Sequence, residues 1–200
     1  MDEPQAQPKR GPNWLIILGG LLVLWLVLLR FLGPGPPSDF NVTDHKIPAK
    51  YDWTLHDLDG QPVSFSKYEG KAVFLNIWAT WCGPCVREMP SIARLAESPR
   101  LKGKNIEFVC VSVDDSIDAP RRFVAGKDWP MTVLHASELP RMFLTEGIPA
   151  TFILSPDGNL VSTTIGGQEW DGETVVSELE KLVAIPPKAK KPADSQTPES

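Results

Sequence analysis

The feature that most constrains this chain is a pair of cysteines, Cys82 and Cys85, which are separated by Gly-Pro. The apolar run Ala72–Ala79 precedes them and predicts a buried central strand. Apolar residues at helical spacing follow in Arg87–Glu97 and predict a helix that begins near Gly83. Cys82 is therefore expected at a helix amino terminus, where unpaired N–H groups and the helix dipole stabilise a thiolate.

Strand and helix patterns alternate through the rest of the globular region. Asp59-Gly60 predicts a hairpin, and Pro156-Asp157-Gly158 predicts a turn between two antiparallel strands. This order predicts an α/β sheet with helices on both faces. The other strands are expected over Tyr51–Leu55, Pro62–Phe65, Ile106–Val113, Met131–Leu134, Ala150–Leu154 and Leu160–Ile165, and the other helices over Ala119–Gly126, Glu138–Leu144 and Gly172–Ala184.

A long apolar segment, Trp14–Leu32, lies near the amino terminus. It is long enough to span a membrane if the Arg30 side chain reaches the interface. The alternative is a cleaved signal peptide, but Gly-Pro-Gly-Pro-Pro follows in place of a small-x-small cleavage site, which favours an uncleaved signal anchor. The prediction is a short cytoplasmic segment (1–13), a single-pass anchor in the cytoplasmic membrane (14–32), a Pro/Gly linker (33–45), an extracytoplasmic domain (46–185) and a disordered tail (186–200).

Composition and spacing exclude several classes of protein. The chain has 20 Lys and Arg against 25 Asp and Glu, so it lacks the basic balance of a nucleic-acid binder. Three cysteines are too few for a Cys₄ zinc site, and Cys110 lies inside an apolar strand pattern. Val86 stands where haem attachment requires His, and Ala79 and Leu75 break a peroxiredoxin-like motif ahead of Cys82. No metal site and no cofactor are predicted.

The residues around the two cysteines resemble a known family. Phe74–Cys85 is similar to the active-site segment of the thioredoxin superfamily. Arg87–Pro90, and the hairpin that ends at Tyr68–Lys71, resemble the membrane-anchored TlpA/ResA-like branch. The resemblance covers about Tyr51–Ala184. It implies a thioredoxin fold, with a central mixed sheet flanked by helices, an added amino-terminal hairpin and an insertion before the last hairpin. It also implies thiol–disulfide oxidoreductase activity outside the cytoplasm.

The resemblance also implies roles for individual residues. Cys82 and Cys85 would form the redox-active disulfide, with Cys82 as the exposed attacking thiolate and Cys85 as the resolving thiol. Gly147–Phe152 resembles the loop whose proline is cis, and Pro149 would leave the Ile148 backbone free to pair with an extended substrate. The remaining residues expected to contact the substrate are Trp81, Gly83 and Pro84.

One departure from thioredoxin concerns a buried acid. Asn76 stands where thioredoxin has that acid, and Asn cannot take a proton from Cys85. Glu88 resembles the carboxylate of the ResA-like branch and is the predicted third catalytic residue; the alternative is an exposed helical Glu beside Arg87. A partly buried carboxylate would have a raised pKa. Pro90 is expected to kink the helix or to end it.

Other residues receive structural interpretations. Cys110, Trp53 and Trp78 are expected in the core, and Asp114-Asp115 in a loop ahead of a helix.

The predicted function is reduction of disulfides in exported proteins, for example in cytochrome c maturation, with a membrane protein as electron donor or acceptor. The alternative is a non-catalytic metal or chaperone-type carrier on the same fold.

Overall fold

The computed structural model describes residues 14, 18–25 and 47–187. Residues 18–25 are helical, and they belong to a unit separate from the domain. Within the described residues, no helix has both the length and the apolar character needed to cross a membrane. Several predicted regions lie wholly or largely outside the described residues: the amino-terminal segment 1–13, much of the span 14–32, the linker 33–45 and the tail from 188 onward.

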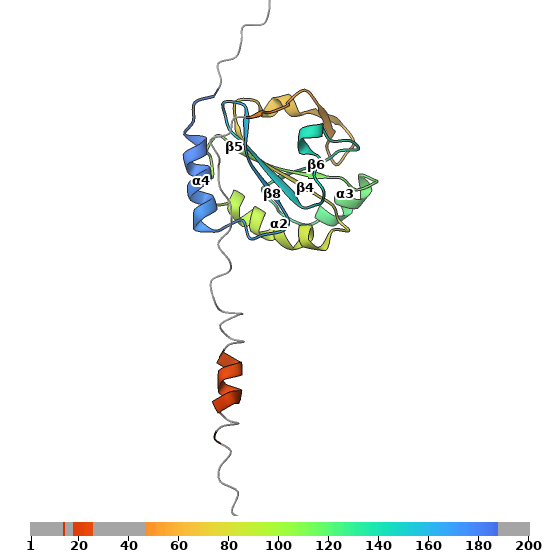
Figure 1. Ribbon diagram of the computed structural model, residues 1–200. Coiled ribbons are helices and arrows are strands. Elements are labelled where there is room, and N and C mark those ends of the chain that lie inside the picture. The colour runs from red at the N-terminus through yellow and green to blue at the C-terminus, as the bar shows by residue number, and fades with distance from the viewer. Residues whose placement is uncertain (1–13, 15–17, 26–46, 188–200) are drawn as a thin grey trace, which may run out of the picture. The chain divides into compact units, whose positions relative to one another are not determined.

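The strands within residues 47–187 form one mixed sheet in the order β1-β8-β7-β4-β5-β6-β2-β3 (Figure 1). The central strands β4, β5 and β6 are parallel, and the other neighbouring pairs are antiparallel. This confirms a thioredoxin-like α/β arrangement. The strands are β1 (Ile47–Pro48), β2 (Thr54–His56), β3 (Pro62–Ser64), β4 (Ala72–Trp78), β5 (Ile106–Ser112), β6 (Thr132–His135), β7 (Ala150–Leu154) and β8 (Asn159–Ile165).

Strand β4 positions the cysteine motif. Each of its residues is buried, because it pairs with β5 on one side and β7 on the other and is covered on both faces. Such a strand is an apolar run without alternation, as the sequence predicted. The chain leaves the sheet after Trp78 and enters α2 (Gly83–Ala96), so the four-residue connection 79–82 places Cys82 directly above the carboxyl end of the strand.

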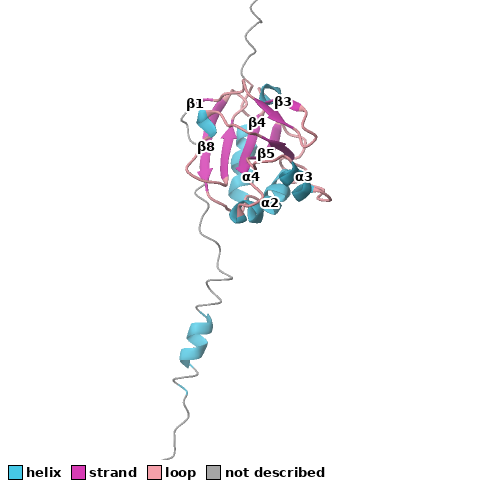
Figure 2. Ribbon diagram, turned by 90° about the vertical axis from the view of Figure 1, so that its right-hand side faces the viewer, coloured by secondary structure: helices cyan, strands magenta, loops and turns pink. Residues whose placement is uncertain are grey.

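The three α-helices of the domain gather on one side of the sheet (Figures 1 and 2). Side chains of α2 and of α4 (Glu173–Val183) share one core cluster, and Phe123 of α3 (Asp118–Val124) packs against it. The opposite face is covered by the 3-10 helices η1 (Phe65–Tyr68) and η2 (Arg141–Phe143) and their loops. The expectation of α-helices on both faces is therefore corrected, because aromatic side chains of short turns cover the second face.

One predicted helix, Glu138–Leu144, was wrong. Only the short turn η2 forms there. Pro140 explains the difference, because a proline disfavours helical backbone at the residue before it, Leu139. The segment formed by α3, β6 and η2 lies between β5 and β7, where the insertion was expected.

Other boundaries differ by a few residues. The hairpin strands β2 and β3 are shorter than predicted, and α2 continues through Pro90 to Ala96, so the alternative that the helix ends at Pro90 is wrong.

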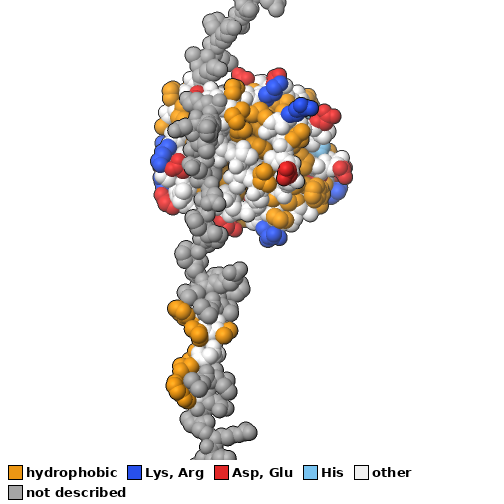
Figure 3. All heavy atoms as spheres, viewed as in Figure 1, with side chains coloured by type: hydrophobic (Ala, Val, Ile, Leu, Met, Phe, Trp, Pro, Cys, Tyr) orange, Lys and Arg blue, Asp and Glu red, His pale blue; other side chains and the backbone are white. Residues whose placement is uncertain are grey.

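The surface of the domain carries charges of both signs. On the face shown in Figure 3, acidic and basic side chains are interspersed around the rim, and hydrophobic atoms appear in patches between them. Trp81, Leu144 and Ile165 are among the exposed large hydrophobic residues of the described chain.

Candidate active site

Cys82 and Cys85 form a disulfide at the amino terminus of α2, with their Cα atoms 5.3 Å apart. Cys82 is the N-cap residue, and its Sγ accepts a hydrogen bond from the backbone N–H of Cys85 at 3.2 Å. Pro84 lies in the first helical turn, where its missing N–H leaves no bond unmade. The sulfur of Cys82 therefore faces the positive end of the helix dipole, which stabilises a thiolate there.

The two sulfur-bearing residues differ in accessibility. Cys82 keeps 6% of its surface accessible, whereas Cys85 has none. The sequence predicted an exposed Cys82, and the structure corrects this to a residue that is mostly covered. The cover comes in part from the loop before β7, because the Ile148 carbonyl oxygen lies 3.6 Å from the Cys82 sulfur. Trp81, Gly83 and Pro84 are exposed around the disulfide.

The loop that faces the disulfide contains a cis peptide bond between Ile148 and Pro149. This confirms the expected cis proline. Pro149 is buried and Ile148 is half-buried. The Pro149 carbonyl accepts a hydrogen bond from the backbone N–H of Gly166 at 2.8 Å, which ties this loop to the end of β8. The sheet thus brings residues 82 and 148 together although they are far apart in the chain.

Glu88 lies one helical turn after Cys85 and is buried, with 2% of its surface accessible. The alternative of an exposed Glu is therefore wrong. Its Oε1 accepts a hydrogen bond from Asn76 Nδ2 at 2.8 Å, and its Oε2 accepts from Trp170 Nε1 at 3.0 Å and from the Gln168 backbone N–H at 3.2 Å. Asn76 of β4 thus donates to a buried carboxylate of α2.

Two opposing effects act on the pKa of Glu88. Burial raises it above its ordinary value, because removal of water disfavours the charged form. The three N–H donors act in the opposite direction, since each of them stabilises the carboxylate, and the nearby charge of Glu169 adds a smaller raising effect. Burial prevails, and a raised pKa brings the group closer to the pH range in which a thiol exchanges its proton.

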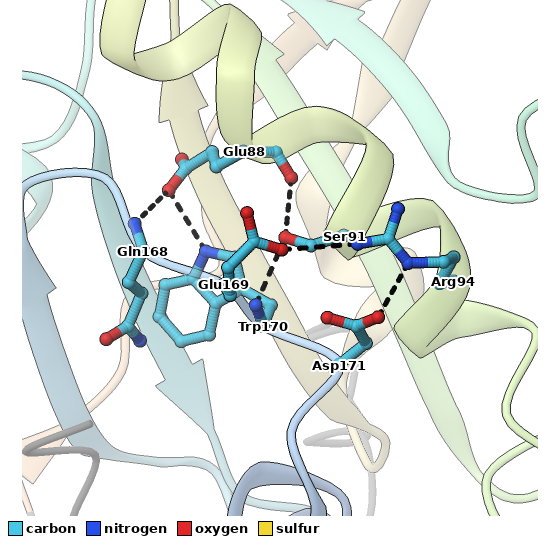
Figure 4. A network of polar contacts seen from close by, with 7 residues as sticks. All are labelled: Glu88, Ser91, Arg94, Gln168, Glu169, Trp170 and Asp171. Atoms are coloured by element: carbon cyan, nitrogen blue, oxygen red, sulfur yellow. Dashed lines mark hydrogen bonds and ion pairs between the residues drawn. The ribbon is translucent and has the colours of Figure 1, made fainter. Parts of the chain in front are cut away.

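The segment between β8 and α4, residues 166–172, lies along α2 and carries most of the partners of Glu88 (Figure 4). A Cβ atom at Gly167 would come within 3.2 Å of the Pro84 carbonyl oxygen, so this contact favours glycine. Farther along, Arg94 binds Asp171 and Glu169. A pocket of about 300 Å³ lies between the start of α2 and this segment, and it is lined by Pro84, Arg87, Glu88, Gly167, Gln168 and Glu169.

A second buried carboxylate, Asp114, supports the loop before Cys82. It accepts a hydrogen bond from the Thr80 hydroxyl at 2.7 Å, from the Thr80 backbone N–H at 3.1 Å and from the Ser112 hydroxyl at 2.7 Å. His135 Nε2 lies 2.8 Å from its backbone oxygen. The sequence placed Asp114 in a loop before a helix and missed this contact. The sequence signal that could have indicated it is an Asp just after an apolar strand pattern, since such a position lies close to the end of the neighbouring strand.

The structure brings all the predicted site residues together. On α2 and the turn before it lie Trp81, Cys82, Gly83, Pro84, Cys85 and Glu88, and opposite them lie Ile148 and Pro149. Cys110 and Trp78 are fully buried, as predicted for core residues. Trp53 packs against Phe65 in the part of the core that η1 and η2 cover. Burial strongly raises the pKa of the Cys110 thiol, which keeps that thiol protonated. Sequence reasoning missed Gly167, Gln168, Trp170 and Asp114.

Comparison with known proteins identifies the family to which this chain belongs. The sequence matches the AhpC/TSA family over residues 44–163, more than half of the chain. Thiol-disulfide oxidoreductase ResA from Bacillus thuringiensis is 30% identical over 133 residues, which cover 66% of this chain and 72% of the relative. ResA from Geobacillus kaustophilus is 32% identical over 117 residues, which cover 58% of this chain and 66% of the relative.

Solved structures point the same way. The thiol:disulfide interchange protein DsbE from Chlorobium tepidum superposes with a TM-score of 0.61 at 25% identity, covering 70% of this chain and 99% of that one. A thioredoxin from Neisseria meningitidis superposes with a TM-score of 0.55 at 27% identity, covering 70% and 91%. The chain therefore belongs to the AhpC/TSA family of the thioredoxin superfamily, and it is a thiol–disulfide oxidoreductase related to the ResA proteins.

Proposed function

We propose that this oxidoreductase reduces disulfides of exported proteins, with Cys82 as the attacking residue and Cys85 as the resolving residue. The observation that carries the proposal is the unequal accessibility of the two residues at the start of α2: Cys82, though largely covered, keeps 6% of its surface accessible, whereas Cys85 is closed to solvent. The N-cap position also favours Cys82 as the thiolate.

The reaction proceeds in two exchanges. The Cys82 thiolate attacks one sulfur of the substrate disulfide, which forms a mixed disulfide and releases the other substrate sulfur as a thiolate. Cys85 then loses its proton, attacks the Cys82 sulfur and releases the second substrate thiolate. The substrate gains two electrons, and the Cys82–Cys85 disulfide is the oxidised product. A partner dithiol must reduce it again before the next cycle.

Glu88 is the group that takes the proton from Cys85. Its carboxylate lies on the next turn of α2 and is buried in the same region as Cys85. Burial raises the pKa of Glu88, so its protonated form becomes accessible nearer neutral pH. Asn76 supports this role as a donor, because its amide contacts the carboxylate and cannot itself accept the proton.

The substrate binds in extended form across the disulfide. The Ile148 backbone beside Pro149 supplies pairing groups for an extended peptide. Trp81, with 68% of its surface exposed, supplies an apolar contact, and Gly83 and Pro84 leave room for the substrate backbone close to the sulfurs.

The cellular setting is part of the proposal. The apolar segment Trp14–Leu32 would anchor the chain in the cytoplasmic membrane, with the domain outside the cytoplasm and close to a membrane protein that supplies electrons. Tethering raises the effective concentration of the two partners without new contacts. Cytochrome c maturation is one process that needs such reduction of exported cysteines.

Insulin reduction by the full chain tests the catalytic assignment. We expect Cys82→Ser to abolish turnover, because no attacking thiolate remains. Cys110→Ala is the matched control and should retain turnover, since Cys110 is a buried free cysteine that takes no part in the disulfide. Turnover that survives in Cys82→Ser would contradict the proposal. Stoichiometric metal retention without turnover would favour the carrier alternative.

The reduction potential of the Cys82–Cys85 pair tests the direction. Equilibration in glutathione or dithiothreitol buffers should give a value near that of thioredoxin, about −270 mV. A value near that of strong oxidants, about −120 mV, would reverse the assignment.

A further inference from the structure

Trp170 is held in place by contacts that do not involve the Glu88 carboxylate. The residue is completely buried, and its ring meets the Phe74 ring edge-on with centroids 4.9 Å apart. Its backbone N–H donates to Ser91 Oγ at 3.1 Å, and that hydroxyl in turn donates to the Glu88 backbone oxygen at 2.7 Å. Trp170 is thus fixed to α2 by its backbone bond to Ser91 (Figure 4), and its ring packs against Phe74 of β4.

The indole N–H of this fixed ring points at the carboxylate of Glu88. The distance from Nε1 to Oε2 is 3.0 Å. An indole nitrogen can only donate, so this bond favours the ionised carboxylate over the protonated acid. The other two donors belong to different elements, since Asn76 lies on β4 and Gln168 precedes Trp170 in the β8–α4 segment.

We propose that Trp170 is a positioning residue for thiol–disulfide exchange, whose indole N–H orients the Glu88 carboxylate and stabilises its ionised form. The proposal rests on the proposed role of Glu88 as proton acceptor for Cys85. It gives a function to a tryptophan that lies 82 residues from Glu88 in the chain and outside the cysteine motif.

Other ionisable groups also act on Glu88, and the test must separate them from Trp170. Cys85 lies on the same helix, and Cys110 of β5 is close enough for its pKa to be raised by the Glu88 charge. Glu169 raises the pKa of Glu88, and Arg87 lines the same pocket. All four groups remain when Trp170 is replaced by another aromatic residue.

The substitution Trp170→Phe removes the donor and keeps an aromatic ring. We expect the titration of Glu88, followed by carbon NMR of the labelled carboxyl in the full chain, to move by about one unit toward higher pH. The midpoint of the exchange rate against pH should move in the same direction by a similar amount. The Glu88→Gln variant assigns the carboxyl signal, because that signal is absent there.

The matched control is Trp78→Phe. Trp78 is also fully buried, and among the described residues its indole nitrogen has no hydrogen-bond partner. This variant makes the same chemical change without removing a donor from Glu88. Its Glu88 titration should coincide with that of the unaltered chain, and an equal shift in both variants would overturn the proposal.

A second measurement requires no altered Trp170. In the unaltered chain, the Trp170 indole N–H resonance should shift with pH as Glu88 titrates, and this shift should disappear in Glu88→Gln. An indole resonance that does not respond to the titration of Glu88 would overturn the proposal even if Trp170→Phe fails to fold.

The outcomes distinguish this inference from the proposed function. In Trp170→Phe, a displaced Glu88 titration with an unchanged dependence of the exchange rate on pH would support stabilisation of the Glu88 carboxylate by Trp170. The same result would contradict Glu88 as the proton acceptor. An unchanged Glu88 titration in Trp170→Phe would overturn the role of Trp170, while the proposed function would still be judged by the exchange rate of Glu88→Gln.

Discussion

The molecule has two buried carboxylates near the cysteine motif, Glu88 and Asp114, and their surroundings differ. Glu88 follows the cysteines on α2 and accepts hydrogen bonds only from N–H groups. Asp114 follows β5 and accepts two hydroxyl bonds together with the Thr80 backbone N–H. The first carboxylate is bound by the segment that lines the pocket. The second binds the connection through which β4 leads into the motif.

This difference indicates different roles for the two carboxylates: Glu88 is suited to proton exchange, and Asp114 supports the turn before Cys82. Glu88 borders the pocket between α2 and the β8–α4 segment, and burial raises its pKa. Asp114 instead fixes the turn at Thr80, two residues before Cys82. The comparison therefore predicts that loss of Glu88 acts mainly on the reaction, whereas loss of Asp114 acts mainly on stability and on the placement of the turn.

The largest effect is expected for Glu88→Gln. The exchange rate near neutral pH should fall by about 100-fold, because general acid–base groups contribute at least this much. Stopped-flow measurement of the second exchange, in which Cys85 resolves the mixed disulfide, provides the readout. Glu97→Gln at the far end of α2 is the control, since this Glu is exposed. Equal rates in the unaltered chain and in Glu88→Gln would contradict the prediction and leave Glu88 with a purely structural role.

The next effect is expected for Asp114→Ala. The free energy of unfolding should fall by about 2 kcal/mol, because the Thr80 N–H and two hydroxyl groups lose a buried acceptor. Urea unfolding measures this change. Asp115→Ala is a matched control, because the neighbouring Asp115 is exposed and its removal should change stability by less than about 0.5 kcal/mol. A stability loss of the same size in both variants would remove the distinction between the two carboxylates.

The pH dependence of stability gives a further, smaller test. A carboxyl whose pKa is raised by folding binds its proton more tightly in the folded state. Its stabilisation is therefore present below the pKa of the unfolded chain, about 4.3, and is lost as pH rises through the folded pKa. The stability of the unaltered chain relative to Glu88→Gln should decline from pH 4 upward in urea unfolding. A difference that stays constant with pH would contradict a raised pKa.

Much of the fold followed from local patterns. The buried strand β4, the helix α2 and the closing helix α4 were predicted because continuous apolar runs and helical periodicity depend on neighbouring residues. The helix expected over Glu138–Leu144 failed because Pro140 outweighed the surrounding pattern. Which face each helix covers was also predicted incorrectly, since periodicity identifies an apolar face but does not identify its partner.

The candidate site divides in the same way. The sequence by itself determined a cysteine pair at a strand–helix junction, because three consecutive local features specify it. The tertiary structure decided how much of each cysteine is accessible and what surrounds Glu88. Trp170 and Thr80 meet their carboxylates across 82 and 34 residues of chain. Such contacts depend on the order of strands in the sheet and on the path of the segment after β8, which spacing along the chain does not encode.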